Sequence, residues 1–176
     1  MESGYILSEH LINAIEYGVP QDRQRIILIG FQKSFISNYI QSKNEYLNIS
    51  EIDLKWNRQE KFSRDFIFSH NWPTIEEFIE DSFRSCPNNI LVELTAQYWF
   101  NKNDVLNHQN SDDCFKPRAG LSRFMSVLEG DDSRKSFKRL HRWRYSPTVC
   151  YGNNEVHLHP YKARRLSVAE GSISPY

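Results

Sequence analysis

The sequence is short of cysteine, of net charge and of long apolar runs. It contains three cysteines, Cys86, Cys114 and Cys150, widely spaced and without a Cys-x-x-Cys pair, which favours a reduced, cytoplasmic protein over a disulfide framework. Its 22 basic residues balance its 22 acidic ones, so no overall field attracts the chain to nucleic acid or to a membrane. No apolar run could span a bilayer, and the acidic start lacks the basic region of a signal peptide.

The 176 residues correspond to about one domain, and the chain has no internal repeat. Residues 5–14 and 23–31 are rich in aliphatic and β-branched side chains, and Gly18 and Pro20 lie between them. This pattern predicts two antiparallel strands near the edge of a sheet. Further strands are predicted at 146–152 and 156–160.

Helices are expected where apolar residues recur about every three to four positions instead of at every second position. Residues 73–83 begin with Pro73, continue with acidic residues and place Ile75, Phe78, Ile79 and Phe83 on one helical face. Residues 121–130 have helical spacing and end at Gly130, whereas residues 89–100 fit either a strand or a helix. A last helix begins at Ser167 and is cut short, which favours a truncated end. The class is therefore α/β.

The stretch QDRQR places Gln21, Arg23 and Arg25 at alternate positions before an aliphatic run. On a strand these three side chains share one face, with the two guanidinium groups about 7 Å apart. Such a pair suits bidentate contacts to a phosphate or a base edge. The competing interpretation is an edge strand whose arginines face water and pair with nearby acids.

The block LINAIEYGVPQDRQRIILIGF resembles the part of DNA (cytosine-5) methyltransferases that contains their Gln-x-Arg-x-Arg signature, motif VIII. The family form runs Asn-Ala-x-Asp-Tyr-Gly-Val-Pro-Gln-x-Arg-x-Arg, followed by aliphatic residues and Ile-Gly. The matching positions are Asn13, Ala14, Tyr17, Gly18, Val19, Pro20, Gln21, Arg23, Arg25, Ile29 and Gly30, whereas Glu16 stands where Asp is usual.

A second block, KRLHRWRYSPTVCYGNNEVHLHPYKARRLSVAE, is similar to motif IX of the same family and to the approach to motif X. The positions that fit are Arg139, Leu140, Ser146, Pro147, Thr148, Val149, His159, Pro160, Arg165, Leu166, Val168 and Glu170, with Ser167 in place of Thr. The resemblance stops after Glu170. The tail GSISPY is not the Ala-rich helix of the family, and the later Gly-Asn segment that touches the cofactor is absent from this sequence.

In this family a cysteine thiolate attacks carbon 6 of a flipped-out cytosine, and S-adenosylmethionine then methylates carbon 5. The resemblance implies that Arg23 and Arg25 lie beside the flipped cytosine and its phosphate, supported by Gln21. The Phe-x-Gly-x-Gly, Pro-Cys-Gln and Glu-Asn-Val motifs do not occur in this sequence. We therefore expect no catalysis by this chain alone, and S-adenosylmethionine only in the complete enzyme. Cys86 and Cys150 are expected to be packing residues.

A basic cluster precedes the SPTV segment. Its members are Arg134, Lys135, Lys138, Arg139, Arg142 and Arg144, interleaved with Trp143 and Tyr145. Basic side chains among aromatic rings suit a DNA backbone, and family context favours that interpretation. The alternative is a solvated face balanced by acids such as Glu76, Glu77, Glu80 and Asp81. Arg118 and Arg123 fit a phosphate contact or a surface helix start equally well. His157 and His159 complete no metal-binding set.

The predicted organisation has four parts. Residues 1–31 form an edge hairpin of an S-adenosylmethionine-dependent methyltransferase sheet, and residues 32–136 form a small mixed α/β target-recognition domain. Residues 137–170 carry motif IX and the approach to motif X, and residues 171–176 are a divergent or truncated tail. The expected function is to bind duplex DNA beside an N-terminal catalytic portion, in a bacterial or phage cytoplasm. The alternatives are a stand-alone DNA-binding module and an inactive remnant.

Overall fold

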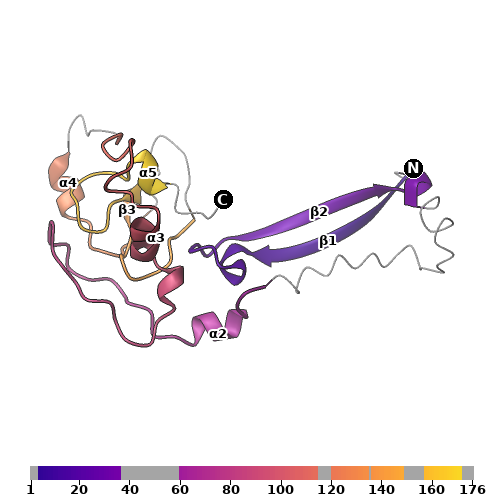
Figure 1. The fold of residues 1–176 in the computed structure, drawn as a ribbon, viewed down its shortest axis with the longest axis horizontal. Coiled ribbons are helices and arrows are strands. Elements are labelled where there is room, and N and C mark those ends of the chain that lie inside the picture. The colour runs from indigo at the N-terminus through magenta and orange to yellow at the C-terminus, as the bar shows by residue number, and fades with distance from the viewer. Residues whose placement is uncertain (1–3, 37–59, 115–119, 135, 149–156, 172–176) are drawn as a thin grey trace.

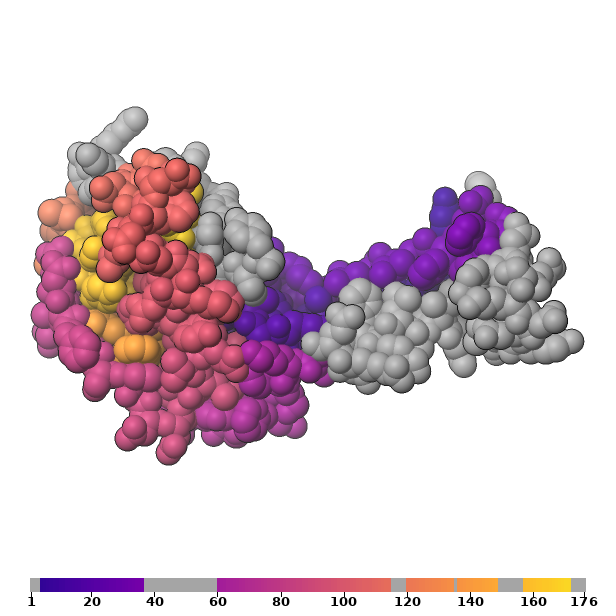
Figure 2. Space-filling view, in the orientation of Figure 1, coloured from indigo at the N-terminus to yellow at the C-terminus, as the bar shows by residue number. Residues whose placement is uncertain are grey.

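A long hairpin and a more compact body make up the structure, a computed structural model that describes residues 4–36, 60–114, 120–134, 136–148 and 157–171 (Figures 1 and 2). The hairpin pairs strand β1 (Tyr5–Asn13) with strand β2 (Gln24–Gln32). A small parallel sheet in the body pairs β3 (Lys138–Arg139) with β4 (His157–Leu158). The helices are η1 (Ala14–Tyr17), α2 (Arg64–Phe68), η3 (Val92–Leu94), α3 (Ala96–Lys102), α4 (Leu121–Met125) and α5 (Val168–Gly171), and residues 33–36 are also helical. None of the helices in these ranges is long and apolar enough to cross a membrane.

The hairpin confirms the predicted antiparallel pair. Its register places Leu11 opposite Ile26, and Leu7 and Leu28 share the same face, since side chains alternate along a strand. These four side chains are 59–64% exposed. The other face is also aliphatic and is half-buried. A two-stranded hairpin is marginally stable by itself in water, so two apolar faces are typical of a sheet edge that packs against further structure.

The apolar core of the described residues consists of small clusters. One lies at the base of the hairpin, where Ile15 packs with Ile67 and Leu94 and with the partly buried ring of Tyr145. A second surrounds α3, and its buried members are Ala96, Trp99, Phe100, Val105, Leu140 and Ala169. A third joins α4 to β4 through Phe124, Val127 and Leu158. Because the clusters are small, polar networks between them carry much of the tertiary structure.

The helix predicted over residues 73–83 is wrong. Glu76 instead forms an antiparallel bridge with Glu129, with both backbone hydrogen bonds at 2.9 Å. This pairing uses backbone groups that a helix would need for itself. Phe78 is buried, and Asp81 adopts a left-handed conformation with φ of 53°. Tertiary pairing therefore outweighs the helical spacing of the apolar residues.

Other predictions agree with the structure at the level of element type. The helices near 121 and 167 and the strand near 157 are present, and the ambiguous stretch 89–100 is helical. The strand predicted at 146–152 shows only a parallel bridge between Ser146 and Gln21, and its remainder from 149 lies outside the described residues. Of the tail predicted at 171–176, Gly171 is the last residue of α5, and residues 172–176 lie outside the described residues. The mixed α/β class is confirmed.

Candidate nucleic-acid interface

Asn13 holds the backbone that leads to Arg23. Its side chain is buried, and its Oδ1 accepts hydrogen bonds from the backbone N–H groups of Arg23 (2.9 Å) and Ile15 (3.4 Å). Its Nδ2 donates to Asp22 Oδ1 at 2.7 Å. The Ala14 N–H also donates to the Arg23 carbonyl at 3.0 Å. One buried amide thus caps η1 and fixes the entry into β2, because its oxygen accepts two backbone hydrogen bonds and its nitrogen donates a third.

The same corner is bonded to the SPT segment, far away in sequence. The Ser146 N–H donates to the Pro20 carbonyl at 2.8 Å, and Gln21 Nε2 donates to the Pro147 carbonyl at 3.4 Å. Thr148 Oγ1 donates to the Asp22 carbonyl at 3.2 Å, across a separation of 126 residues. The two blocks that carry the family resemblance therefore meet in space.

The structure separates the three predicted site residues. Gln21 lies in an isolated bridge and uses its amide for the contact to Pro147. Arg23 precedes β2 and is half-buried, whereas Arg25 lies on β2 opposite Ile12 and is exposed. Arg25 Nη1 donates to the carbonyl of its neighbour Gln24 at 2.6 Å. Gln21 and Arg23 are therefore held by the corner, and only Arg25 is on the strand itself.

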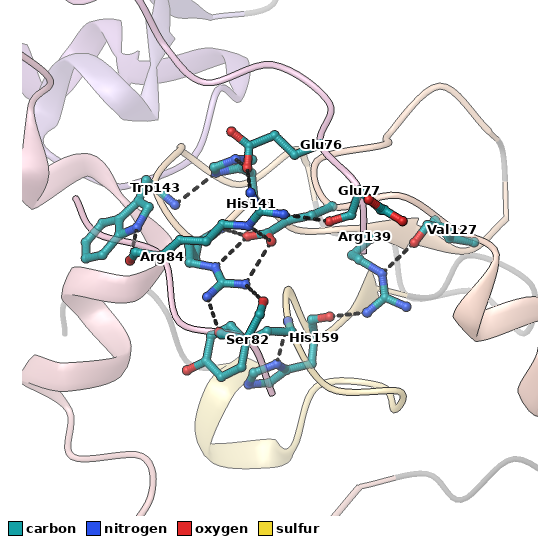
Figure 3. Close-up of polar contacts among 12 residues, drawn as sticks. Glu76, Glu77, Ser82, Arg84, Val127, Arg139, His141, Trp143 and His159 are labelled. Atoms are coloured by element: carbon teal, nitrogen blue, oxygen red, sulfur yellow. Dashed lines mark hydrogen bonds and ion pairs between the residues drawn. The ribbon is translucent and has the colours of Figure 1, made fainter. Parts of the chain in front are cut away.

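Arg139 is an internal residue. Its side chain is 0% exposed, and its Nε donates to the Val127 carbonyl at 2.8 Å (Figure 3). Its terminal nitrogens donate to the carbonyls of Phe124, His159 and Lys162. The guanidinium lies 3.6 Å from the centroid of the Phe78 ring. Burial lowers the pKa of Arg139 to about 10, which leaves it charged at neutral pH.

Arg142 is also internal and is paired with the fully buried Glu129. Arg142 Nε and Nη2 donate to the two Glu129 oxygens at 2.8 and 2.9 Å, and the Arg142 backbone N–H donates to Glu129 Oε1 at 3.0 Å. Arg142 Nη1 donates to the Ser82 carbonyl at 2.6 Å, and the guanidinium lies over the Tyr161 ring. Bidentate, charge-assisted bonds of this kind stabilise a buried pair only when every donor is satisfied.

The burial of Arg139 and Arg142 contradicts the prediction that they belong to a DNA-facing surface. Both guanidinium groups are enclosed by protein acceptors and have no access to a phosphate. Three members of the predicted cluster remain accessible: Arg134 is exposed, and Lys138 and Arg144 are half-buried. Arg134 lies 3.7 Å from Asp131, and Arg144 lies 3.4 Å from Asp132. Lys135 lies outside the described residues.

A pocket of about 440 Å³ lies beside these residues, and its lining includes Glu76, Phe83, Arg84, His141 and Trp143. Arg84 Nη1 pairs with Glu76 Oε2 at 2.6 Å, and the Trp143 indole N–H donates to the Arg84 carbonyl at 3.0 Å (Figure 3). The sequence pattern does not mark Phe83 or Arg84 as candidate site residues. It places Phe83 on the apolar face of a helix that does not form, so the exposure of the Phe83 ring could not be anticipated.

The histidines form no metal centre among the described residues. His159 stacks on Phe100 with ring centroids 5.5 Å apart, and its Nε2 lies 3.5 Å from Glu170 Oε1. Arg164 binds both oxygens of Glu170 at 2.7 Å, and the Arg164 and His159 contacts hold the Glu170 pKa well below its usual range. Burial lowers the pKa of His159 despite this carboxylate. The region is a packed polar core.

Residues 1–173 match the family model for C-5 cytosine-specific DNA methylases. The chain belongs to this family. The match covers the hairpin, the body and both resembling blocks, and it extends through the region between them, where the sequence offered no motif.

Relatives in this methylase family include bacterial type II enzymes. The chain is 51% identical over 167 residues to the type II methyltransferase M.NmeDI of Neisseria meningitidis serogroup C, covering 95% of the chain and 36% of that protein. It is 41% identical over 63 residues to M.FnuDI of Fusobacterium nucleatum, covering 32% of the chain and 18% of that protein. The chain therefore spans about a third or less of the length of these relatives.

A solved structure also resembles the chain weakly. It is a prophage-encoded protein from E. coli described as a DNA modification methyltransferase, with a TM-score of 0.45 and 16% identity. The match covers 98% of the chain and 50% of that protein.

Proposed function

We propose that this chain is the DNA-recognising portion of a DNA (cytosine-5) methyltransferase of the type II, restriction-modification kind. It would bind duplex DNA and complete an active site whose nucleophile belongs to a separate catalytic portion. The observation that carries the proposal is the corner where Pro20, Gln21 and Asp22 bond to residues 146–148. Through these hydrogen bonds the corner fixes the segment that carries Arg23 and Arg25 to the body.

In this proposal Arg23 and Arg25 bind the flipped cytosine and its phosphate, and Gln21 acts by fixing the corner. A guanidinium offers several donors in one plane and stays charged, so it can hold a phosphate and a ring oxygen while charge develops. Each charge-assisted hydrogen bond contributes about 1.5–3 kcal/mol. Removing one should therefore slow methyl transfer by roughly one to two orders of magnitude.

The partner in this proposal is the N-terminal catalytic portion of the enzyme. Its docking surface would be the hairpin face of Leu7, Leu11, Ile26 and Leu28, which is exposed in this chain. S-adenosylmethionine would belong to the catalytic portion, because the Phe-x-Gly-x-Gly motif that serves the cofactor in this family does not occur in this sequence.

The test is reconstitution of methyl transfer to duplex DNA. The chain is mixed with the part of the Neisseria relative that lies outside the matched 36%, and transfer of a labelled methyl group is measured. We expect activity only when both parts are present, and a 10- to 100-fold loss for Arg23→Gln or Arg25→Gln. Activity that is indifferent to both substitutions would overturn the assigned roles. Failure of the mixture to bind DNA would overturn the proposal as a whole.

A further inference from the structure

Phe83 is an exposed aromatic side chain on a tightly held segment. Its ring is 90% exposed, although a side chain of this size usually gains stability from burial. The residues on either side are anchored. Arg142 Nη1 and Nη2 donate to the carbonyl and hydroxyl of Ser82 at 2.6 and 3.1 Å, and the Trp143 indole N–H donates to the Arg84 carbonyl. Arg142 and Trp143 thus fix the backbone on both sides of Phe83, and the Phe83 ring projects from this fixed segment into solvent.

Beside Phe83, Arg84 and Glu76 form a donor–acceptor pair at the edge of the 440 Å³ pocket. Arg84 Nη1 bonds to Glu76 Oε2 at 2.6 Å, and Arg84 Nη2 donates to the Glu77 carbonyl at 2.7 Å. The first contact is an ion pair and the second is a hydrogen bond that uses one N–H of Nη2, so N–H groups of both terminal nitrogens remain for a ligand. The side chains of Arg84 and Glu76 are 29% and 36% exposed. Glu76 would reach a ligand through Oε1, because its Oε2 is buried.

His141 adds a buried donor at the back of the pocket. Its Nδ1 accepts the backbone N–H of Trp143 at 3.0 Å, so the ring proton is on Nε2. Nε2 is buried and has no hydrogen-bond partner, with Glu76 Oε2 at 3.8 Å. Burial, together with the neighbouring Arg144 and Arg142, lowers the pKa of His141 despite Glu129 and Glu76, which keeps the ring neutral at pH 7. A buried polar atom without a partner calls for a ligand or a shift of Glu76 on binding.

We infer that this pocket reads one G·C base pair of the target duplex. Arg84 donates to guanine N7 and O6, Glu76 accepts from cytosine N4, and Phe83 contacts the adjacent base step. The two free N–H groups of Arg84 match the two neighbouring acceptors of guanine, and a carboxylate next to them matches the amino group of the paired cytosine. The inference rests on the proposed function, since it concerns the duplex that the chain would bind.

The position of the pocket supports the same partner. Trp143 lines it, and Ser146, which bonds to Pro20 at the Gln-x-Arg-x-Arg corner, is three residues further along the chain. Three residues of extended chain span at most roughly 10 Å. This is about three base-pair steps of B-form DNA. The three residues from Pro20 to Arg23 add at most roughly another 10 Å, so a duplex held at Arg23 would pass the pocket within about six base pairs of the flipped cytosine.

The experiment selects duplexes from a randomised library with the chain bound to its catalytic portion. Bound and methylated duplexes are sequenced for the wild type, for Arg84→Gln and for Arg84→Lys. We expect the preference for G·C over other base pairs to fall roughly 5- to 150-fold in both variants at one position, within about six pairs of the methylated cytosine. Arg84→Lys keeps the charge but not the bidentate geometry, so a loss in both variants separates base reading from attraction to phosphate.

The matched control is Arg134→Gln, because Arg134 also lies beside an acidic residue but is more exposed than Arg84. It should weaken binding to all sequences equally and reduce the log–log salt slope by about 0.9, without changing the selected sequence. An unchanged selected sequence in both Arg84 variants, with binding intact, would overturn the inference and leave the proposed function standing. If wild-type protein selects no duplex and methylates none, the proposed function fails first. Thermal unfolding of each variant checks that the fold is retained.

Discussion

Replacement of Arg139 by methionine should destabilise the protein strongly. Methionine fills much of the volume of the arginine stem, but it leaves the carbonyls of Phe124, Val127, His159 and Lys162 without their donor. It also removes the cation from the Phe78 ring. The loss affects two separate segments of the body. Phe124 and Val127 lie in and just after α4, whereas His159 and Lys162 follow β4.

The size of the effect follows from the burial of these groups. Removal of one partner from a buried charged network costs about 3–5 kcal/mol, and each carbonyl left unsatisfied contributes about 1–3 kcal/mol unless water reaches it. We therefore expect Arg139→Met to lower the free energy of unfolding by about 3–5 kcal/mol. Arg139→Lys should cost less, since its ammonium group can still serve part of the acceptor set.

The assay is urea unfolding followed by tryptophan fluorescence. With a slope of about 2 kcal/mol per molar urea, the midpoint should fall by roughly 2 M for Arg139→Met. Arg134→Met is the control, and it should leave the midpoint unchanged because Arg134 is exposed. A midpoint shift below about 0.5 M, combined with weaker and less salt-dependent DNA binding, would refute the internal role. Such a result would mean that Arg139 belongs to the DNA-facing surface that the sequence predicts.

Three further outcomes are expected. Burial lowers the pKa values of His141 and His159, so as the pH falls through about 6.5 the unfolded chain binds more protons than the folded one. The melting temperature should therefore fall between pH 7.5 and 5.5, and each histidine should lower the free energy of unfolding by at most about 1.4 kcal/mol. A rise in melting temperature would contradict this. Asn13→Ala should cost about 1–2 kcal/mol and slow reconstituted methyl transfer by displacing Arg23; unchanged activity would show that Asn13 does not position it. Gly130→Ala should lower the melting temperature, because φ is 82° and a Cβ would lie 3.1 Å from a backbone oxygen; an unchanged value would contradict the strain.

The hairpin could be predicted because its signal is local. Alternating side chains and a turn with Gly18 and Pro20 specify two antiparallel strands, and the structure has them. The helix at 73–83 failed because the bridge between Glu76 and Glu129 involves a segment about fifty residues away. Periodicity within one segment contains no information about such a partner.

The basic cluster shows the corresponding limit for the site. Arg134 and Arg139 look alike in sequence, yet one is exposed and the other is fully buried. The difference arises from carbonyls supplied by distant segments, which no pattern within residues 134–144 indicates. Arg84 was missed for the same reason, since its acidic neighbour and its pocket are created by folding. The roles of Gln21, Arg23 and Arg25 remain predictions from the resemblance.

The segment of the body from Lys61 to Ser146 is anchored at both of its ends to one short stretch of the hairpin base. The N–H groups of Lys61 and Phe62 donate to the Glu16 carbonyl, and the Ser146 N–H donates to the Pro20 carbonyl. The chain between these anchors is thus a closed loop in the polymer sense, and the entropy of closing such a loop depends only logarithmically on its length. Doubling its length would cost only about 0.6 kcal/mol. Segments of different size could therefore be exchanged between these anchors while the backbone of Arg23 keeps its position.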